Sequence, residues 1–173
     1  MPLKNTTLGE KIQFDFESSR FGLILGAQSS EGFCALFLGD DPLKLKAELQ
    51  NRFPKAQLIE GCASLKSLIG KIIKWVEDPC LPLNVKLDAR GTFFQKTVWK
   101  ALLEIPRGST CSYHEIAKKI GKPKAFRAVG RACATNPISL IIPCHRVVKS
   151  SGALSGYAWG VSIKKTLLEI ESA

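Results

Sequence analysis

Cys144 and His145 are adjacent in this 173-residue chain, in the segment Pro143-Cys144-His145-Arg146 that follows the apolar run Leu140-Ile141-Ile142. A cysteine at the end of a buried strand is usually an inert core residue. A neighbouring imidazole changes that expectation, because it favours the thiolate, which is the form that attacks electrophiles. The pair therefore predicts a nucleophilic thiol.

The composition is that of a packed globular protein. Hydrophobic residues make up 45% of the chain, and 173 residues suffice for one or two small domains. Residues 1–7 lack the apolar core of a signal peptide, and no apolar stretch reaches the roughly 18 residues that span a bilayer. We expect a soluble, cytoplasmic monomer with no membrane partner.

Six cysteines are spread along the chain without a CxxC pair, at positions Cys34, Cys62, Cys80, Cys111, Cys133 and Cys144. His114 and His145 are the two histidines that would have to complete a zinc site. The sequence predicts free thiols, no metal and no cofactor.

Charge is distributed unevenly between the two halves. Residues 1–90 hold 12 Lys and Arg against 11 Asp and Glu, whereas residues 91–173 hold 13 against 4. Because cationic contacts to phosphates supply most non-specific affinity for nucleic acid, the second half is expected to bind a polyanion. The alternative is a solvated basic surface that aids solubility.

The first half predicts a small sheet with helices. Residues 12–16 alternate in polarity, and the apolar segments 21–28 and 32–38 follow after short polar breaks, which is typical of a three-stranded antiparallel meander. Reactive side chains do not gather in this half, so its expected role is structural.

Two helices and a further strand are expected after this meander. Asp41 followed by Pro42 favours a helix start, and an amphipathic stripe runs over residues 65–76. Prolines end this second helix, and residues 83–87 are expected to return as a strand.

Two capping boxes mark helix starts in the second half. Thr92 pairs with Gln95, and Ser112 pairs with Glu115. In each pair the hydroxyl and the longer side chain satisfy two otherwise unpaired backbone amides at the helix start. An amphipathic helix is expected after each.

A third helix is expected over residues 124–135, after the turn at Gly121. Its Lys124, Arg127 and Arg131 lie at i, i+3 and i+7, on one face. Two helices joined by a tight turn, the second with a basic stripe, predict a helix-turn-helix. An ordinary helical hairpin with solvated charges is the alternative.

Residues 91–173 resemble the catalytic domain of O6-alkylguanine-DNA alkyltransferases, especially the C-terminal part of the bacterial adaptive-response alkyltransferases. The matching segments are Phe94-Gln95-Lys96-Thr97-Val98-Trp99, Ser112-Tyr113, Gly121-Lys122-Pro123-Lys124-Ala125, Arg127-Ala128-Val129-Gly130, Asn136, residues 142–148 and Leu154-Ser155-Gly156-Tyr157. Residues 1–90 resemble the family's N-terminal domain more weakly, chiefly through Leu38-Gly39-Asp40-Asp41.

This resemblance implies an α/β (α+β) protein of two domains. Residues 1–88 would form a structural, ribonuclease-H-like domain with a three-stranded antiparallel sheet. Residues 89–173 would form a mainly helical domain with a winged-helix-like helix-turn-helix, which binds DNA and accepts the alkyl group. Since no segment precedes the meander, we expect a stand-alone repair protein without the zinc domain and activator region of the adaptive-response proteins.

The resemblance also implies a direct DNA repair reaction in which Cys144 takes the alkyl group of O6-alkylguanine irreversibly. His145 would act as the base through a water, with Glu171 orienting the imidazole. Tyr113 would protonate the departing purine, and Asn136 would tie the recognition helix to the cysteine segment.

Alkyltransferases of this family act on double-stranded DNA, so the resemblance implies that the damaged nucleotide is flipped out. Arg127 would fill the gap as an intercalating finger, with its helix in the minor groove. The other expected DNA contacts are Tyr113, His114, Lys122, Ala125, Gly130 and Ser150.

The resemblance places a further group of residues around the alkyl group: Val147, Ser139, Tyr157, Ala158, Trp159 and Lys164. Ser139 stands where many members have proline, and Ala158-Trp159 stands where some have smaller residues. Because of these departures, the sequence does not determine which alkyl groups are accepted. O4-methylthymine is a further expected substrate.

Two other functions are compatible with parts of the sequence. A helix-turn-helix regulator without chemistry would leave Cys144 unreactive. A cysteine hydrolase would pair Cys144 with His145, but the sequence offers no oxyanion loop beside the thiol, and adjacent residues cannot easily reach each other directly.

Overall fold

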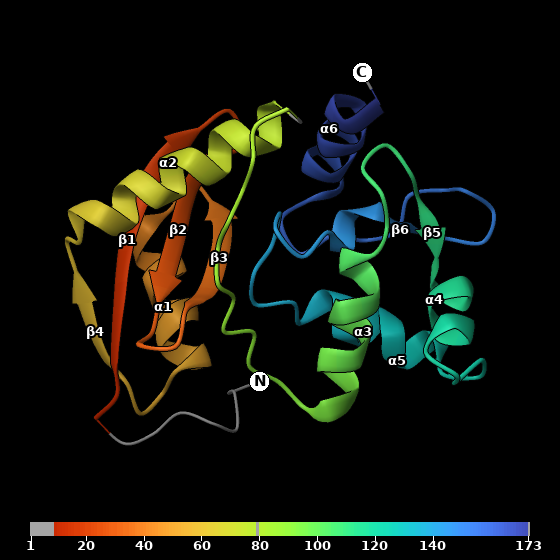
Figure 1. Cartoon of the computed structure of the whole chain (residues 1–173), viewed down its shortest axis with the longest axis horizontal. Coiled ribbons are helices and arrows are strands. Elements are labelled where there is room, and N and C mark those ends of the chain that lie inside the picture. The colour runs from red at the N-terminus through yellow and green to blue at the C-terminus, as the bar shows by residue number, and fades with distance from the viewer. Residues whose placement is uncertain (1–8, 79, 173) are drawn as a thin grey trace. The chain divides into compact units, whose positions relative to one another are not determined.

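The computed structural model describes residues 9–78 and 80–172. The chain packs into two compact units, Met1–Gly91 and Thr92–Ala173 (Figure 1). None of the helices in the described ranges has the length and hydropathy needed to cross a membrane.

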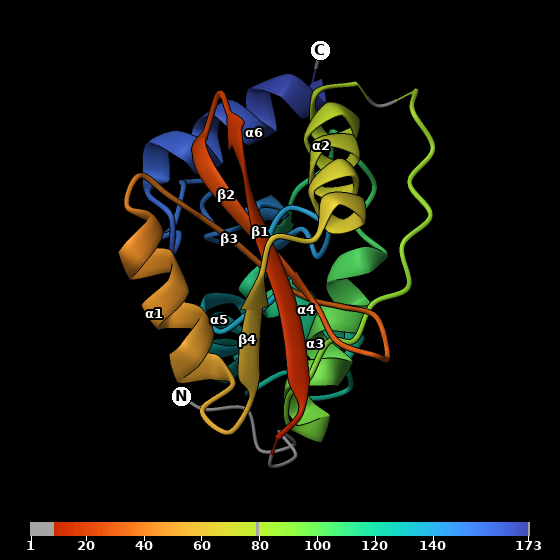
Figure 2. The ribbon, with the colours of Figure 1, turned by 90° about the vertical axis from the view of Figure 1, so that its left-hand side faces the viewer.

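A mixed sheet with two helices makes up the first unit. Its elements are β1 (Lys11–Ser19), β2 (Gly22–Gln28), β3 (Phe33–Gly39), α1 (Pro42–Arg52), β4 (Gln57–Glu60) and α2 (Ala63–Glu77). The described strands form one four-stranded sheet in the order β3-β2-β1-β4, seen in Figure 2. The predicted meander is confirmed, because β2 pairs antiparallel with both β1 and β3.

Two sequence expectations for this sheet are wrong. The sheet has a fourth strand, β4, which pairs parallel to β1, and which spans too few residues to show a periodic pattern. Residues 83–87 do not form a strand; Leu87 alone makes an isolated bridge, to Phe33. Leu81 and Pro82 precede this stretch in irregular backbone, and only one residue of it reaches a partner.

Local signals set the two helices of the first unit. Asp41 caps α1, its carboxylate accepting from the amides of Leu43 and Lys44, with Pro42 in the first turn. The apolar stripe of α2 is buried and contacts β1 and β2. At Gly26 a Cβ atom would come within 2.5 Å of the Ile69 side chain, so the helix lies directly on the strand.

The second unit is mainly helical. Its elements are α3 (Phe93–Leu103), β5 (Cys111–Ser112), α4 (Tyr113–Lys119), α5 (Phe126–Ala134), the 3₁₀ turn η1 (Cys144–Arg146), β6 (Val147–Val148) and α6 (Val161–Ser172). Both predicted capping boxes are present, at the starts of α3 and α4.

Helices α4 and α5 pack against each other and are joined by a tight turn. Gly121 adopts φ +71° there, a conformation that costs glycine little. Helix α5 begins at Phe126, so the expected start at Lys124 is wrong by two residues: Lys124 lies in the turn, and Ala125 makes no side-chain cap.

A two-residue parallel pairing joins distant parts of this unit. Cys111 pairs with Val147, and Ser112 pairs with Val148. Tyr113 directly follows β5, and Cys144 lies three residues before β6. The pairing therefore brings the start of α4 to the cysteine turn.

Candidate active site

Cys144 opens the turn η1 at the end of a buried segment. The residue is 6% exposed, and its Sγ accepts a hydrogen bond from Nδ2 of Asn136 at 3.2 Å. The same amide nitrogen donates to the carbonyl oxygen of Ile142 at 2.8 Å, and Oδ1 of Asn136 accepts from the amide of Ile138. Asn136 thus ties the segment after α5 to the sulfur.

Burial disfavours the charged form of the Cys144 thiol. Burial raises its pKa, and the hydrogen bond from Asn136 and the charge of Lys164 offset this only in part. Burial thus opposes the thiolate that the adjacent imidazole favours, and a reactive thiolate at Cys144 stays a prediction. The physical reason is that a buried sulfur loses its hydration, which disfavours the charged form.

His145, Arg146 and Glu171 form a buried cluster between η1 and α6. Nε2 of His145 lies 2.9 Å from Oε1 of Glu171. Arg146 holds both oxygens of the same carboxylate, through Nε at 2.9 Å and Nη2 at 2.8 Å, and its Nη1 donates to the carbonyl oxygen of Ile105. One carboxylate therefore orients two neighbouring side chains.

The electrostatics of this cluster decide which ring nitrogen of His145 is basic. Burial tends to raise the pKa of Glu171, but hydrogen bonds from His145 and Arg146 outweigh it and hold the pKa at about 2. Burial lowers the pKa of His145, against the effect of Glu171. A carboxylate only accepts, so a neutral His145 carries its proton on Nε2.

Nδ1 of His145 is then the nitrogen with a free lone pair. It is buried and has no hydrogen-bond partner among the protein atoms that the structure describes. The ring is thereby set up to accept a proton at Nδ1.

Tyr113 belongs to a second cluster of polar groups near the cysteine turn. Its Oη lies 2.6 Å from Oγ of Ser155. Ser155 Oγ also accepts from Nζ of Lys164 at 2.8 Å, and Nζ donates to the carbonyl oxygen of Val147 at 2.6 Å. Burial raises the pKa of Tyr113 and lowers that of Lys164.

Of the residues expected around the alkyl group, Val147 lies on β6 and Lys164 on α6, whereas Ser139, Tyr157, Ala158 and Trp159 come from two loops. Nε1 of Trp159 donates to Oγ of buried Ser139 at 2.7 Å, which links the 157–160 turn to the segment before Cys144. The ring of Tyr157 lies edge-on to His145, with centroids 6.5 Å apart. Ala158, between the two aromatic residues, is exposed.

Several expected DNA-binding residues lie on α4, α5 and the 149–152 turn. His114 stacks on Phe126 with ring centroids 4.1 Å apart, and its Nδ1 lies 3.1 Å from Oγ of Ser150. Arg127 is exposed, with its guanidinium 5.6 Å from the centre of the Phe126 ring. Gly130 lies under Tyr113, where an added Cβ would be 3.7 Å from that ring.

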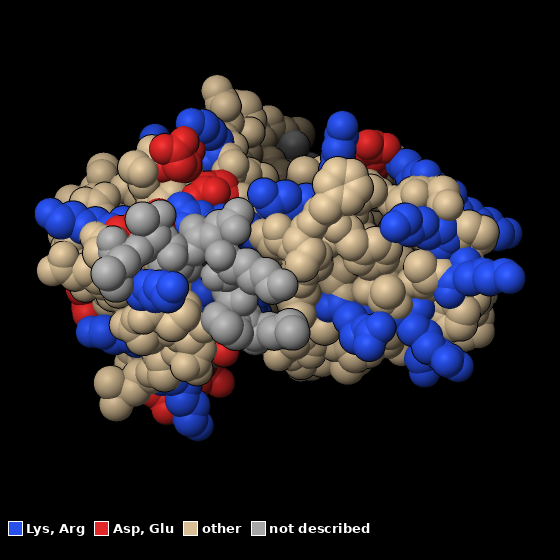
Figure 3. Space-filling view, turned by 90° about the horizontal axis from the view of Figure 1, so that it is seen from below, with Lys and Arg blue, Asp and Glu red and all other residues tan. Residues whose placement is uncertain are grey.

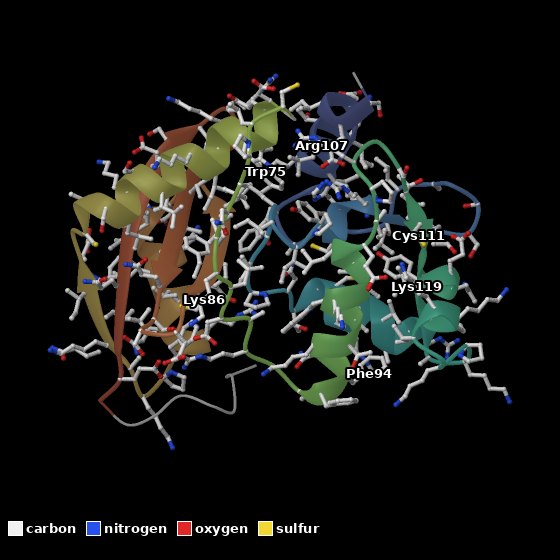
Figure 4. All side chains as sticks on the ribbon, in the orientation of Figure 1. Trp75, Lys86, Phe94, Arg107, Cys111 and Lys119 are labelled. Atoms are coloured by element: carbon white, nitrogen blue, oxygen red, sulfur yellow. The ribbon has the colours of Figure 1, made fainter. Side chains whose placement is uncertain are left out.

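Lys122 and Ala125 lie at the turn before α5. Nζ of Lys122 is 5.6 Å from the ring centre of Phe94, which Figure 4 labels at the start of α3. Lys122, Pro123, Lys124 and Ala125 line an open hollow of about 420 Å³. The space-filling view in Figure 3 shows blue Lys and Arg side chains gathered on the part formed by the second unit, with few red ones among them.

The structure brings Cys144, His145, Glu171, Tyr113, Asn136, Val147 and Lys164 together by direct contacts or adjacency. Two residues with strong contacts to them had no assigned role in the sequence interpretation, namely Arg146 and Ser155. Arg146 had a signal, since an arginine beside a buried histidine needs an acid partner. No local sequence pattern pointed to Ser155, because its partners Tyr113 and Lys164 are 42 and 9 positions away in the chain.

Metal-binding geometry is not found in the described ranges: among residues 9–78 and 80–172 there is no group of three or more His, Cys, Asp or Glu that suits a metal ion. The side chains that the structure gathers here are a buried thiol, Cys144, and the His145–Glu171 pair.

The family model described as 6-O-methylguanine DNA methyltransferase, DNA binding domain, matches residues 93–173. The bifunctional transcriptional activator/DNA repair enzyme Ada of Escherichia coli is 45% identical over 161 residues, which cover 93% of this chain and 46% of Ada. The chain thus spans about half the length of that relative. The methylated-DNA–protein-cysteine methyltransferase of Methanosarcina barkeri is 44% identical, over 92% of this chain and 97% of its own length.

Solved structures agree with these relatives. The crystal structure of Mycobacterium tuberculosis OGT in complex with DNA is 36% identical and superposes with a TM-score of 0.77, covering 92% of each chain. With matches of this length and identity, the chain belongs to the methylated-DNA–protein-cysteine methyltransferase family.

Proposed function

We propose that this protein repairs double-stranded DNA by transferring the alkyl group of O6-alkylguanine to its own Cys144. The observation that carries the proposal is the buried thiol of Cys144, held by Asn136 and followed by a histidine whose Nε2 is bonded to Glu171. The DNA complex of the M. tuberculosis relative supports a DNA partner.

The proposed reaction begins with removal of the thiol proton by Nδ1 of His145, through a water. The thiolate attacks the methyl carbon, so that an S–C bond forms while the C–O6 bond breaks and its electron pair stays with the purine. Tyr113 gives its proton to the purine, which leaves as guanine. Glu171 keeps Nδ1 available by accepting from Nε2.

Transfer ends after one event per protein molecule. A thioether sulfur is a poor leaving group, so the new S–C bond on Cys144 is not broken again. Protein and substrate are thus consumed one for one.

DNA binding is assigned to α4 and α5, with α5 in the minor groove. A stacked O6 atom cannot reach a buried sulfur, so the nucleotide rotates out of the duplex at a cost of a few kcal/mol. The exposed Arg127 fills the gap. The remaining contacts are to the backbone and come from Tyr113, His114, Lys122, Ala125, Gly130 and Ser150.

The flipped base is enclosed by Val147, Ser139, Tyr157, Ala158, Trp159 and Lys164. The Trp159–Ser139 hydrogen bond closes one side of this space and limits the size of the alkyl group. O4-methylthymine, which presents a methyl on a ring oxygen in the same way, is a second substrate.

For the folds of the two units we keep the finer description that the family resemblance implies as a proposal. The order β3-β2-β1-β4, with β4 parallel to β1, supports a ribonuclease-H-like domain over residues 1–88 with a structural role. The β5–β6 pairing next to α4 and α5 supports a winged-helix-like domain over residues 89–173. The protein works as a cytoplasmic monomer.

Intact mass spectrometry with peptide mapping tests this function. After incubation with excess O6-methylguanine duplex, we expect one added methyl group, on Cys144. Cys144→Ala should bind the duplex and gain none, whereas Cys111→Ala, which removes a half-buried thiol on β5, should behave as wild type. Methylation of another residue, or repeated turnover, contradicts the proposal.

A further inference from the structure

Lys164 places an ammonium group in the interior of the second unit. The residue is 1% exposed, although it lies on a helix whose buried positions otherwise suit apolar side chains. A buried cation is costly unless polar groups surround it. Nζ has two such partners, the carbonyl oxygen of Val147 at 2.6 Å and Oγ of Ser155 at 2.8 Å.

Ser155 connects this cation to Tyr113. Its Oγ lies 2.6 Å from Oη of Tyr113 and 3.4 Å from the carbonyl oxygen of Val147. An ammonium group only donates, so Ser155 accepts from Lys164 and has one proton of its own to give. Tyr113 is the nearer acceptor, and the Val147 oxygen already accepts from Lys164.

The hydrogen bonds therefore run in one direction, from Lys164 to Ser155 to Tyr113. When Tyr113 accepts from Ser155, its own phenolic proton stays free to point at a bound base. The direction of the chain is what a proton donor at Tyr113 requires.

We propose that Lys164 and Ser155 form a proton relay that returns a proton to Tyr113 during alkyl transfer. Ser155 is a positioning residue that acts through Tyr113. The relay rests on the proposed function, since it serves the protonation of the departing purine.

Protons and charges balance in this step. As the C–O6 bond breaks and its electron pair stays with the purine, Tyr113 gives its proton to the purine. Ser155 gives its proton to the phenolate oxygen, and Lys164 replaces the proton of Ser155. Guanine, Tyr113 and Ser155 end neutral, and Lys164 ends as an amine that regains a proton from solvent.

Burial favours this direction of transfer. It lowers the pKa of Lys164, which makes the ammonium group a better acid, and raises the pKa of Tyr113, which makes a phenolate costly to leave behind. Cys144 and Cys133 also face Lys164, and burial raises the pKa of both thiols. Burial thus disfavours the thiolate form of both, which would otherwise compete with Ser155 for the Lys164 ammonium group.

Ser155→Ala tests the relay, because it removes the middle hydroxyl and leaves the bond from Lys164 to Val147. Two rates are measured on the full chain: single-turnover methyl transfer from an O6-methylguanine duplex, and alkylation of Cys144 by iodoacetamide. The second reaction has no purine to protonate. We expect transfer to slow by about tenfold or more, within the range of general acid catalysis, while iodoacetamide reactivity and duplex affinity stay at wild-type values.

Two further variants serve as controls. Ser155→Thr restores a hydroxyl and should recover most of the transfer rate. Ser151→Ala removes an exposed hydroxyl from the same loop and should change neither rate. If Ser155→Ala transfers the methyl group at the wild-type rate, the relay is overturned. It is also overturned if methyl transfer and iodoacetamide reactivity fall in parallel, because that would indicate a structural role.

A double-mutant cycle adds an independent check. If Ser155 and Lys164 act in one chain, Ser155→Ala combined with Lys164→Met should be no slower than the slower single variant. Multiplicative losses would show that the two residues act separately and would overturn the relay. A wild-type chain that transfers no methyl group at all would instead overturn the proposed function.

Discussion

Nε2 of His145 lies 2.9 Å from Oε1 of Glu171, which follows it by 26 positions in the chain. The contact requires the end of α6 to lie against η1, and the turn after α3 packs against the same end of α6. Gly108 of that turn has φ +74°, and a Cβ there would come within 2.9 Å of the Glu171 carbonyl oxygen. Close packing at a glycine thus places the carboxylate that orients His145.

Replacing Glu171 by glutamine should weaken both folding and transfer. Arg146 would keep a buried charge without its carboxylate, which typically costs about 3 kcal/mol of unfolding free energy. The tautomer of His145 would no longer be set, and transfer should slow by at least about tenfold. Urea denaturation and single-turnover kinetics measure the two effects.

Glu169→Gln is the matched control on the same helix. Its side chain is 62% exposed and lies 3.7 Å from exposed Lys165, so unfolding free energy should change by less than about 0.5 kcal/mol. Equal losses in the two variants would contradict the assigned role of the buried carboxylate.

Acid should destabilise the folded protein through the same cluster. The folded pKa of Glu171 is about 2, below its ordinary value of 4.5. Its contribution is therefore fully present above pH 4.5 and is lost as pH falls toward 2, by about 3 kcal/mol in all. His145, with its lowered pKa, adds a loss in the same direction as pH falls below 6.5.

Urea midpoints between pH 7 and pH 3 measure this dependence. Glu171→Gln should show a flatter acid limb than wild type, because the residue no longer titrates. An identical slope in the two proteins would place the acid sensitivity elsewhere.

Arg127→Ala should reduce transfer from duplex DNA and spare transfer from the free base. The exposed guanidinium fills the gap left by the flipped nucleotide, so its loss should cost a few kcal/mol, the scale of unstacking. Transfer rates from an O6-methylguanine duplex and from free O6-methylguanine are compared. Arg20→Ala, which replaces an exposed arginine of the first unit, is the control. If Arg127→Ala lowered the transfer rate equally on both substrates, Arg127 would not be the intercalating residue.

Trp159→Gly should widen the range of accepted alkyl groups. The indole is held toward the Cys144 segment by its bond to Ser139, and overpacking against a larger substituent typically costs about 1–3 kcal/mol. We expect a selective gain in transfer from O6-benzylguanine relative to O6-methylguanine. Unchanged selectivity with a lower melting temperature would place the indole in the core only.

Local patterns in the sequence determined much of the secondary structure. The capping boxes at Thr92 and Ser112 involve side chains three residues apart, and the alternation in β1 reflects its own two faces, so neither depends on distant residues. The four residues of β4 are too few to show an alternation of apolar and polar side chains. In the stretch 83–87, only Leu87 makes a β-bridge, to Phe33.

Tertiary structure alone decided the surroundings of the site residues. The sequence put a thiol beside an imidazole, and family resemblance pointed to Glu171, but the roles of these residues stay predictions. Whether Cys144 rests as thiol or thiolate depends on burial by residues from the whole second unit. The bond between Tyr113 and Ser155 spans 42 positions, and such contacts exist only once packing has closed the loop between them, because no local preference of either residue encodes its partner.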